Sequence, residues 1–310
     1  MPRRLAHRAL ALLLAAATLA ACAPRPTVVA PADPCRPPPR AVATLREARN
    51  FLLVDATLNG QPAALLVDTG ADITTLTPLA AAALRLPADP AHNRRLAGIT
   101  GSVAAPGGTL HRLALGGHEI ATDRSIGVSA LPTLAGLDPP VAGLLGADVL
   151  AGFEVELDLP AGRMALYPPP PRAACPGWRP WPQAAAAKLH RTSSGLEHLD
   201  VLVDGRAVPA LLDTGARTTL ITRETAAALG VTAPMLAADA PRTGVGVGGS
   251  SAEFRRHRFA TLGLPGAMAR DVPVNIADLP LPGVDMLLGA DFLGHRHVWI
   301  SYSTSRLFLR

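Results

Sequence analysis

The sequence is poor in aromatic and charged residues. Phe, Trp and Tyr make up 4% of the 310 residues and Asp, Glu, Lys and Arg make up 17%, while 49% are apolar. A chain of this length and composition can bury a sizeable core, but Ala, Val and Leu must build most of it. Pro (31) and Gly (28) are abundant, and both favour short strands and many turns over long helices.

The signature motifs of several enzyme classes are also missing. The sequence has no phosphate-binding loop, no zinc signature and no Gly-x-Ser-x-Gly. His295 and His297 could form a metal-binding pair, but the first half of the chain has no matching pair. We therefore expect exposed or half-buried loop histidines there, and we predict neither a metal nor another cofactor.

The excess of basic residues is small once the N-terminus is set aside. Residues 1–21 hold three Arg and no acid, so without them the formal charge falls from +5 to 26 − 24 = +2. Nucleic-acid-binding proteins typically carry a larger positive net charge, so we expect no nucleic acid partner.

The N-terminus has the pattern of an export signal. Arg3, Arg4 and Arg8 precede ALALLLAAATLA, an apolar run too short to span a bilayer comfortably. The run leads into Leu19-Ala20-Ala21-Cys22, which resembles a bacterial lipobox, where the Cys becomes the lipid-modified first residue of the mature chain. An ordinary export signal with a free Cys22 is the alternative. We predict a lipoprotein signal peptide over residues 1–21 and a tether over 22–42. Because Ala23 and not Asp follows the Cys, we expect a lipid anchor in the outer membrane, facing the periplasm.

Two cysteines follow Cys22. Cys35 and Cys175 each lie in a Pro-rich segment. Two remaining cysteines in an exported chain favour one disulfide over two free thiols. Such a bridge would close a long loop, worth about 4–5 kcal/mol in the chain-entropy description.

The chain contains an internal repeat. The segments LLVDTGADITTL and ALLDTGARTTLI each carry Asp-Thr-Gly behind an apolar run, at an offset of 213 − 68 = 145. Asn59-Gly60 and Asp204-Gly205 share this offset, and each dipeptide favours a two-residue hairpin. Farther along, LLGAD occurs twice, at 144–148 and 287–291. A repeat this long indicates duplication of a whole domain.

The two halves also share helix signals and closing strands. Thr77-Pro78 and Thr222 each precede an Ala-rich stretch, which predicts two short N-capped helices, the second ending at Gly230. Each half then ends in a pair of strands. We predict a mainly β fold with short helices: β-barrel lobes over residues 43–167 and 192–310, joined by a Pro-rich linker over 168–191.

The paired triplets predict a shared chemical site. Asp68 and Asp213 on facing lobes would lie within hydrogen-bond reach, so they could not both ionise and would share one proton. The ionised member could take a proton from water while the other supports a peptide carbonyl. Gly70 and Gly215 would let the loops turn tightly and approach each other. The hydroxyls of Thr69 and Thr214 could hold the two loops together.

These motifs resemble those of retropepsin-type aspartic proteases, with two retroviral-protease-like lobes fused in one chain. The matching residues are Asp68 to Ala71, Asp213 to Ala216 and the two Leu-Leu-Gly triplets. The resemblance implies peptide-bond hydrolysis in a cleft between the lobes. It also implies that Thr69 and Thr214 lock the catalytic loops and that the Leu-Leu-Gly segments pack behind them.

Two Gly-rich stretches resemble the flaps that close over substrate in this family. They are GITGS at 98–102 and GVGGS at 246–250. The candidate flap residues are Gly98, Gly101, Gly246 and Gly249.

The residues around the two triplets differ in ways that bear on the chemistry. Ala71 and Ala216 supply no hydroxyl to stabilise an ionised Asp, so we expect a mildly acidic or neutral pH optimum. Next to them the repeat has Asp72 in one half and Arg217 in the other. We interpret these as solvated loop charges or one weak salt bridge, with an asymmetric, charge-selective cleft as the alternative.

Other acids near the motifs have structural interpretations. Asp148 and Asp291 in LLGAD are expected to cap or charge the start of a short helix. Asp158 fits the usual closing strand of the family, and Ser301 takes its place in the second half.

Three functions are compatible with these patterns. The leading hypothesis is a lipid-anchored aspartic endopeptidase that acts on peptides or proteins as a single-chain pseudo-dimer, monomeric in solution. The main alternative is a catalytically silent, peptide-binding lipoprotein with the same fold. A third is a scaffold lipoprotein whose lobes pair between chains, so that activity arises only in a dimer.

Overall fold

The structure is a computed structural model that describes residues 33, 35–98, 101–171, 175–246, 249–278, 281 and 283–310. The chain divides into Met1–Asp33 and a compact unit, Pro34–Arg310, and the description below concerns the second. The predicted signal peptide and Cys22 lie outside the described residues.

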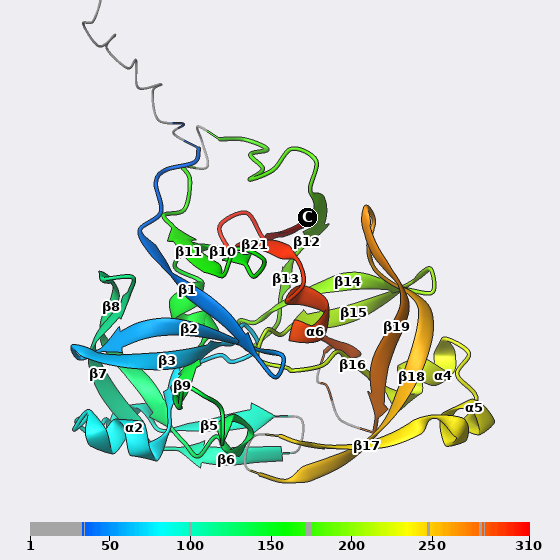
Figure 1. Cartoon of the computed structure of the whole chain (residues 1–310), viewed down its shortest axis with the longest axis horizontal. Helices are drawn as coiled ribbons and strands as arrows, with labels where there is room; N and C mark the ends of the chain where they lie inside the picture. Colours follow the sequence, from blue (N-terminus) through cyan, green and yellow to red (C-terminus); the bar gives the residue numbers. More distant parts are fainter. Residues whose placement is uncertain are drawn as a thin grey trace, which may run out of the picture. The chain divides into compact units, whose positions relative to one another are not determined.

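The first lobe is built on a six-stranded barrel (Figure 1). Its strands follow the order β2-β3-β9-β4-β8-β7, and β2 pairs with β7 to close the ring. The elements of this lobe are β2 (Phe51–Leu58), β3 (Gln61–Val67), β4 (Thr75–Leu76), α2 (Pro78–Ala83), η2 (Pro90–His92), β5 (Arg94–Gly98), β6 (Gly101–Ala105), β7 (Gly107–Leu115), β8 (His118–Val128), η3 (Pro132–Leu134), β9 (Val141–Leu145) and α3 (Ala147–Leu150).

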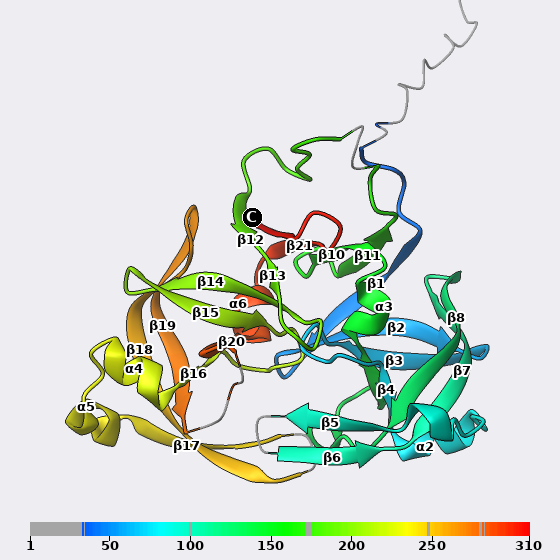
Figure 2. The ribbon, with the colours of Figure 1, turned by 180° about the vertical axis from the view of Figure 1, so that it is seen from behind.

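The second lobe repeats this barrel, as its strand order shows (Figure 2). The order is β14-β15-β20-β16-β19-β18, and β14 pairs with β18. The elements are β13 (His190–Arg191), β14 (Glu197–Val203), β15 (Arg206–Leu212), β16 (Leu220–Thr222), α4 (Arg223–Ala228), α5 (Ala233–Ala238), β17 (Ala240–Val245), β18 (Ser251–Leu264), β19 (Ala267–Ala277), β20 (Met286–Leu288) and α6 (Ala290–Leu293). The predicted mainly β, two-lobed fold is confirmed.

A sheet shared by both halves joins the lobes. Its order is β12-β22-β21-β10-β11-β1, and at its centre β10 of the first half pairs antiparallel with β21 of the second. The bounds are β1 (Ala41–Ala48), β10 (Glu154–Asp158), β11 (Arg163–Tyr167), β12 (Ala185–Lys188), β21 (His297–Ser301) and β22 (Arg306–Leu309). Strand β1 begins two residues before the predicted lobe boundary at residue 43, and β12 and β13 lie within the predicted linker.

The hairpin turns follow from the residues at their tips. Asn59 and Asp204 both have φ of 46°, and a Gly with positive φ follows each, as a two-residue turn requires. Each turn side chain also holds a neighbouring strand. Asn59 Oδ1 accepts from the Arg112 N–H at 2.9 Å, and Asp204 Oδ1 accepts from the Thr261 N–H at 2.7 Å.

The predicted helices start and stop at their cap residues. The Thr77 hydroxyl accepts from the Ala80 N–H at the start of α2, and the Thr222 hydroxyl accepts from the Thr225 N–H at the start of α4. Gly230 takes a φ of 100° just after α4 ends, a backbone conformation that favours Gly. Within the described residues, no helix is both long and apolar enough to cross a membrane.

Leu, Val and Ala make up most of the main hydrophobic core. Its few aromatic members are Phe259, Phe292 and Tyr302. The scarcity of aromatic residues in the sequence is thus reflected in an aliphatic core, as predicted.

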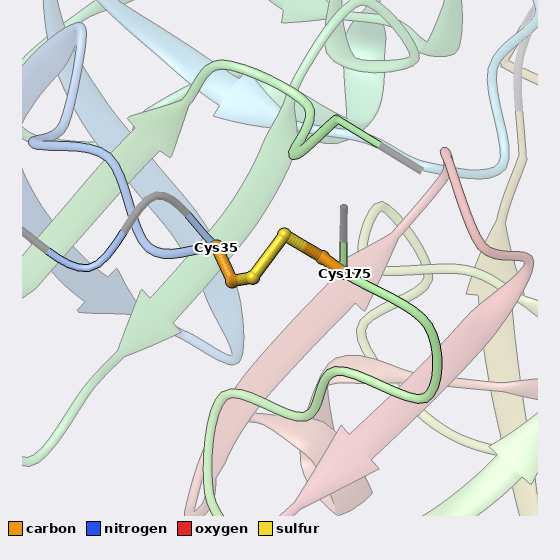
Figure 3. The surroundings of a disulfide bond; sticks show 2 residues. All are labelled: Cys35 and Cys175. Carbon is orange, nitrogen blue, oxygen red and sulfur yellow. A yellow bond between two sulfur atoms is a disulfide. The ribbon is translucent and has the colours of Figure 1, made fainter. Parts of the chain in front are cut away.

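A disulfide joins Cys35 to Cys175 (Figure 3). The two residues are 140 positions apart. The bridge fastens the segment that leads into β1 to the Pro-rich segment between the lobes.

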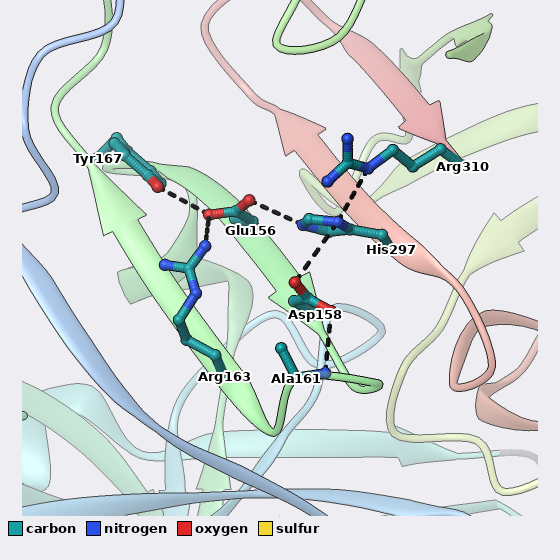
Figure 4. A network of polar contacts seen from close by, with 7 residues as sticks. All are labelled: Glu156, Asp158, Ala161, Arg163, Tyr167, His297 and Arg310. Carbon is teal, nitrogen blue, oxygen red and sulfur yellow. Dashed lines mark hydrogen bonds and ion pairs between the residues drawn. The ribbon is translucent and has the colours of Figure 1, made fainter.

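A network of buried charges ties the two closing hairpins together on the shared sheet (Figure 4). Glu156 is 1% exposed, and its carboxylate contacts His297 Nε2 and the Tyr167 hydroxyl, each at 2.7 Å, and Arg163 at 2.5 Å. Arg310 Nε donates to the other ring nitrogen of His297 at 3.0 Å.

His295 is exposed, as expected. The prediction was wrong for His297, which is 9% exposed in β21, where it bonds to Glu156 and its ring packs against Trp181.

Candidate active site

The two Asp-Thr-Gly triplets stand at equivalent places in the two lobes. Asp68 directly follows β3, and Asp213 directly follows β15. The Asp68 N–H donates to the Leu145 carbonyl at 3.0 Å, and the Asp213 N–H donates to the Leu288 carbonyl at 3.1 Å. The Leu-Leu-Gly strands therefore hold each triplet in place at its first residue.

Thr69 and Thr214 join the two loops by four reciprocal hydrogen bonds. Each backbone N–H donates to the hydroxyl of the other Thr, at 3.0 and 3.1 Å. The Thr69 hydroxyl donates to the Leu212 carbonyl and the Thr214 hydroxyl to the Val67 carbonyl, both at 2.7 Å. Because Thr69 is 2% exposed and Thr214 is 0% exposed, water cannot replace these bonds. The loops from the two lobes thus meet within one chain.

Gly70 and Gly215 lie directly against the carboxylates of the opposite loops. A Cβ added to Gly70 would lie 2.5 Å from Asp213 Cγ, and one added to Gly215 would lie 2.3 Å from Asp68 Cγ. No side chain fits at such distances, so both positions require Gly. The arrangement brings the two half-buried carboxylates together across the lobe boundary.

The surroundings of the two carboxyl groups favour protonation. Burial, followed by the charge of Asp213, raises the pKa of Asp68 to about 8. Burial raises the pKa of Asp213 to about 6, although the Ala216 and Gly215 N–H groups lower it. Asp213 Oδ1 accepts from these two N–H groups at 2.9 and 3.0 Å. The pair therefore holds one proton near neutral pH, and the environment favours Asp68 as its site.

A Thr–Asp brace supports each loop from behind. Asp148 Oδ1 accepts from both the N–H and the hydroxyl of Thr74, each at 2.7 Å. Asp291 Oδ1 accepts from the N–H and hydroxyl of Thr219 at 2.8 and 2.7 Å. Both acids lie in the first turn of a helix, α3 or α6, as predicted, although the N-cap positions belong to Gly146 and Gly289. Their carboxylates brace the loops instead of capping the helices.

Sequence reasoning missed the role of Thr74 and Thr219. The hydroxyl of each also accepts from the N–H of the Leu-Leu-Gly glycine, Gly146 or Gly289, at 3.1 Å. The signal was present in the repeat, since Thr74 and Thr219 share the offset of 145 with the two Asp.

Asp72 and Arg217 occupy equivalent positions but have different surroundings. Arg217 Nε donates to the Arg49 carbonyl at 2.9 Å, and its guanidinium lies 5.4 Å from the centroid of the Phe51 ring. Arg217 thus extends from the second lobe to the first. Asp72 is exposed and makes no side-chain hydrogen bond or ion pair with the described residues. It therefore remains a solvated charge close to Asp68, whose pKa it raises.

The candidate flap glycines lie at the ends of two hairpins. Gly98 pairs with Gly101 where β5 and β6 meet, and the Gly249 N–H donates to the Gly246 carbonyl between β17 and β18. Residues 99–100 and 247–248 lie outside the described residues. Each hairpin packs on its own lobe beside the catalytic loop, through Leu96 with Ile73 and through Phe254 with Leu220 and Ala216.

The closing hairpins use Asp158 and Ser301 in the same way. Asp158 Oδ1 accepts from the Ala161 N–H at 3.1 Å, and the Ser301 hydroxyl accepts from the Thr304 N–H at 3.3 Å.

Within the part of the chain that the structure describes, no group of three or more His, Cys, Asp and Glu could hold a metal ion.

Known protein families match each lobe separately. The family described as aspartyl protease matches residues 54–149, and the family described as gag-polyprotein putative aspartyl protease matches residues 199–295. Each match includes one Asp-Thr-Gly triplet and one LLGAD segment. No curated protein matches the chain.

One solved structure has a similar fold over most of the chain. The crystal structure of the aspartic proteinase from Irpex lacteus has a TM-score of 0.52 at 14% sequence identity, over 87% of this chain and 96% of that chain. A retropepsin-like aspartic protease from Rickettsia conorii aligns with 41% of this chain and 90% of its own, at 20% identity and a TM-score of 0.33. One aspartyl protease family matches each lobe, and the chain thus consists of two retropepsin-like aspartyl protease domains in tandem.

Proposed function

We propose that this protein is an aspartic endopeptidase that hydrolyses peptide bonds between its two lobes. One observation carries the proposal: the carboxylates of Asp68 and Asp213 each lie against the Gly of the opposite loop, in loops joined by reciprocal Thr bonds. This arrangement keeps two carboxyl groups together that have raised pKa values and share one proton.

In the proposed mechanism one carboxyl group acts as the general base and the other as the general acid. Ionised Asp213 takes a proton from a water molecule, whose oxygen attacks the peptide carbonyl carbon. Protonated Asp68 gives its proton to the carbonyl oxygen, which yields a neutral tetrahedral intermediate. As the C–N bond breaks, the proton on Asp213 passes to the leaving nitrogen, and the hydroxyl proton of the intermediate returns to Asp68. The pair is then ready for another cycle.

A peptide mixture tests this proposal directly. Residues 34–310 are offered a diverse peptide library between pH 4 and 9, and mass spectrometry identifies new termini. We expect cleavage by the wild type and none by the Asp68→Asn or Asp213→Asn variants. Absence of wild-type cleavage at every pH, or the same cleavage by the variants, would contradict the proposal.

The pH dependence of kcat/KM should be bell-shaped around neutral pH. Below the lower apparent pKa both carboxyls are protonated, so no base remains; above the upper one both are ionised, so no acid remains. Since the two pKa values are raised to about 6 and about 8, the limbs should fall near these values. Initial rates on one fluorogenic peptide across this range measure them, and a maximum below pH 4 would show that the surroundings do not raise the pKa values.

Substitution of Asp72 should move only one limb of that profile. The negative charge of Asp72 raises the pKa of Asp68, so Asp72→Asn should lower the pKa of Asp68 and shift the alkaline limb to lower pH. Asp200→Asn is the matched control, because Asp200 is an exposed carboxylate in β14, outside the catalytic loops. An unchanged alkaline limb in Asp72→Asn, or an equal shift in the control, would contradict the expectation.

A further inference from the structure

The outer side of the shared sheet presents exposed basic side chains over an aromatic cluster. The guanidinium of Arg36 lies 5.9 Å from the centroid of the Trp299 ring, and that of Arg179 lies 5.6 Å from the Phe308 ring. Trp299 and Phe308 belong to one buried cluster. Two distant segments of the chain therefore place an exposed cation over the same group of rings.

Two further cations stand on the same side of the sheet. Lys188 of β12 pairs directly with Arg306 of β22, and Ala186 pairs with Phe308 two residues along. Residues two apart in a strand face the same side, so Lys188 and Arg306 share the side of Phe308. Like charges directly opposite each other in a sheet are unfavourable, and a bound anion would offset this cost. We call Arg36, Arg179, Lys188 and Arg306 the basic face.

The sequence provides almost no acid to neutralise the basic face. No Asp or Glu occurs between residues 159 and 196, or between 292 and 310. The acids that β10 contributes to this side, Glu154 and Glu156, are each 1% exposed and bound within the protein. Asp158 is also mostly buried and holds the Ala161 N–H. Around Arg179, Lys188 and Arg306 the sequence therefore supplies basic residues without neighbouring acids, while Asp33 lies three residues before Arg36.

All three tryptophans of the chain lie beneath or beside this patch. Trp178, Trp181 and Trp299 belong to or pack against the aromatic cluster, and Trp178 is only half-buried. Basic side chains together with Trp at a surface suit the headgroup region of an anionic bilayer, where cations meet phosphates and aromatic rings lie at the boundary.

The path of the chain favours a membrane as the partner over a soluble polyanion. Cys35 is bridged to Cys175, two residues before Gly177 and three before Trp178, so the N-terminal segment joins the folded unit beside the basic face. The proposed lipid attachment site, Cys22, lies 35 − 22 = 13 residues earlier in the sequence. A membrane anchor there would hold the folded unit to the bilayer by a segment that spans at most about 45 Å when fully extended, attached next to Arg36.

We propose that the basic face binds the anionic headgroups of a membrane surface, independently of any lipid on Cys22 and of peptidase activity. Binding of this kind depends on ionic strength and on the fraction of anionic lipid, because it rests on exposed charges.

Vesicle binding by residues 34–310, which form a compact unit of their own, tests the proposal without the anchor. Co-sedimentation compares phosphatidylcholine vesicles with vesicles that contain phosphatidylglycerol. We expect binding to the anionic vesicles alone, and its loss at high salt. Each basic residue near an anionic surface contributes about fivefold to partitioning, so a variant with all four residues of the basic face changed to Gln should bind at least about a hundredfold more weakly.

A second variant controls for net charge. It also replaces four exposed Arg with Gln, but in the two lobes, outside the shared sheet: Arg85, Arg206, Arg242 and Arg270. We expect this control to keep most of the binding. Equal loss in both variants, or no preference for anionic vesicles, would overturn the proposal, and so would binding of polyphosphate in the absence of vesicle binding.

Intrinsic fluorescence gives an independent measurement of which face binds. Because all tryptophans of the chain are associated with the aromatic cluster, brominated lipids in anionic vesicles should quench the fluorescence of the wild type and not that of the basic-face variant. Binding without quenching would show that another face meets the membrane.

Discussion

Replacing either Asp68 or Asp213 with Asn is expected to lower kcat/KM about 10⁴-fold, because each variant lacks either the base or the acid of the proposed pair. Asn keeps the shape and still accepts from the N–H groups of the loop, but it neither takes up nor releases a proton. The measurement is the rate on the best peptide found in the library, at the pH optimum of the wild type. Asp200→Asn, which removes an exposed carboxylate, should retain full activity.

The loss of activity should not be accompanied by a loss of stability. Burial raises both pKa values of the pair, so the ionised groups disfavour the folded state above the ordinary pKa of a carboxyl group. Removing one ionisable group relieves this cost at high pH. We expect the thermal midpoint of either Asn variant at pH 8 to equal or exceed that of the wild type. Inactive variants with clearly lower midpoints would point to misfolding instead of lost chemistry.

The features that could be predicted from the sequence are those encoded by short segments or by their repetition. Asn59-Gly60 and Thr77-Pro78 determine a turn and a helix start through their own backbone preferences, whatever the rest of the chain does. The offset between Asp68 and Asp213 predicted that two loops share a site, because equivalent parts of two similar lobes can meet at a common boundary. The structure places the two loops together in this way.

The residues that were missed or misjudged depend on partners far along the chain. Thr74 bonds to Asp148, 74 positions away, because β9 passes between β3 and β4. The ring of His297 is buried, lies 4.2 Å from that of Trp181 and bonds to Glu156, 141 positions away. The local sequence pattern does not predict how deeply a residue is buried, or which residue it bonds to, when the segment that covers it has no regular secondary structure. The Pro-rich segment that carries Trp181 covers one side of the shared sheet, and its composition alone predicts only a linker.

Replacing the hydroxyls that join the two loops should have the largest effect on stability. Thr69→Val preserves the shape of the side chain but leaves the buried Leu212 carbonyl without its donor and the buried Thr214 N–H without its acceptor. Each unsatisfied group costs about 1–3 kcal/mol, so the variant with two such groups should lose roughly 2–6 kcal/mol of unfolding free energy. Thr214→Val should lose a similar amount through the Val67 carbonyl and the Thr69 N–H. Urea titration followed by circular dichroism measures both losses.

Thr75→Val is the matched control, because Thr75 is also 0% exposed but, among the described residues, its hydroxyl bonds only to the Ile73 carbonyl of the same lobe, at 3.2 Å. Its loss should be about 1 kcal/mol. If Thr69→Val were no less stable than this control, the bonds between the loops would add little to the joining of the lobes. The double variant Thr69→Val/Thr214→Val tests whether the bonds of the two hydroxyls depend on each other. Thr69 and Thr214 share bonds with each other, so their losses should not add. Once one substitution has let the loops move apart, the bonds of the remaining hydroxyl stabilise the protein less. The double variant should therefore lose less unfolding free energy than the sum of the two single losses.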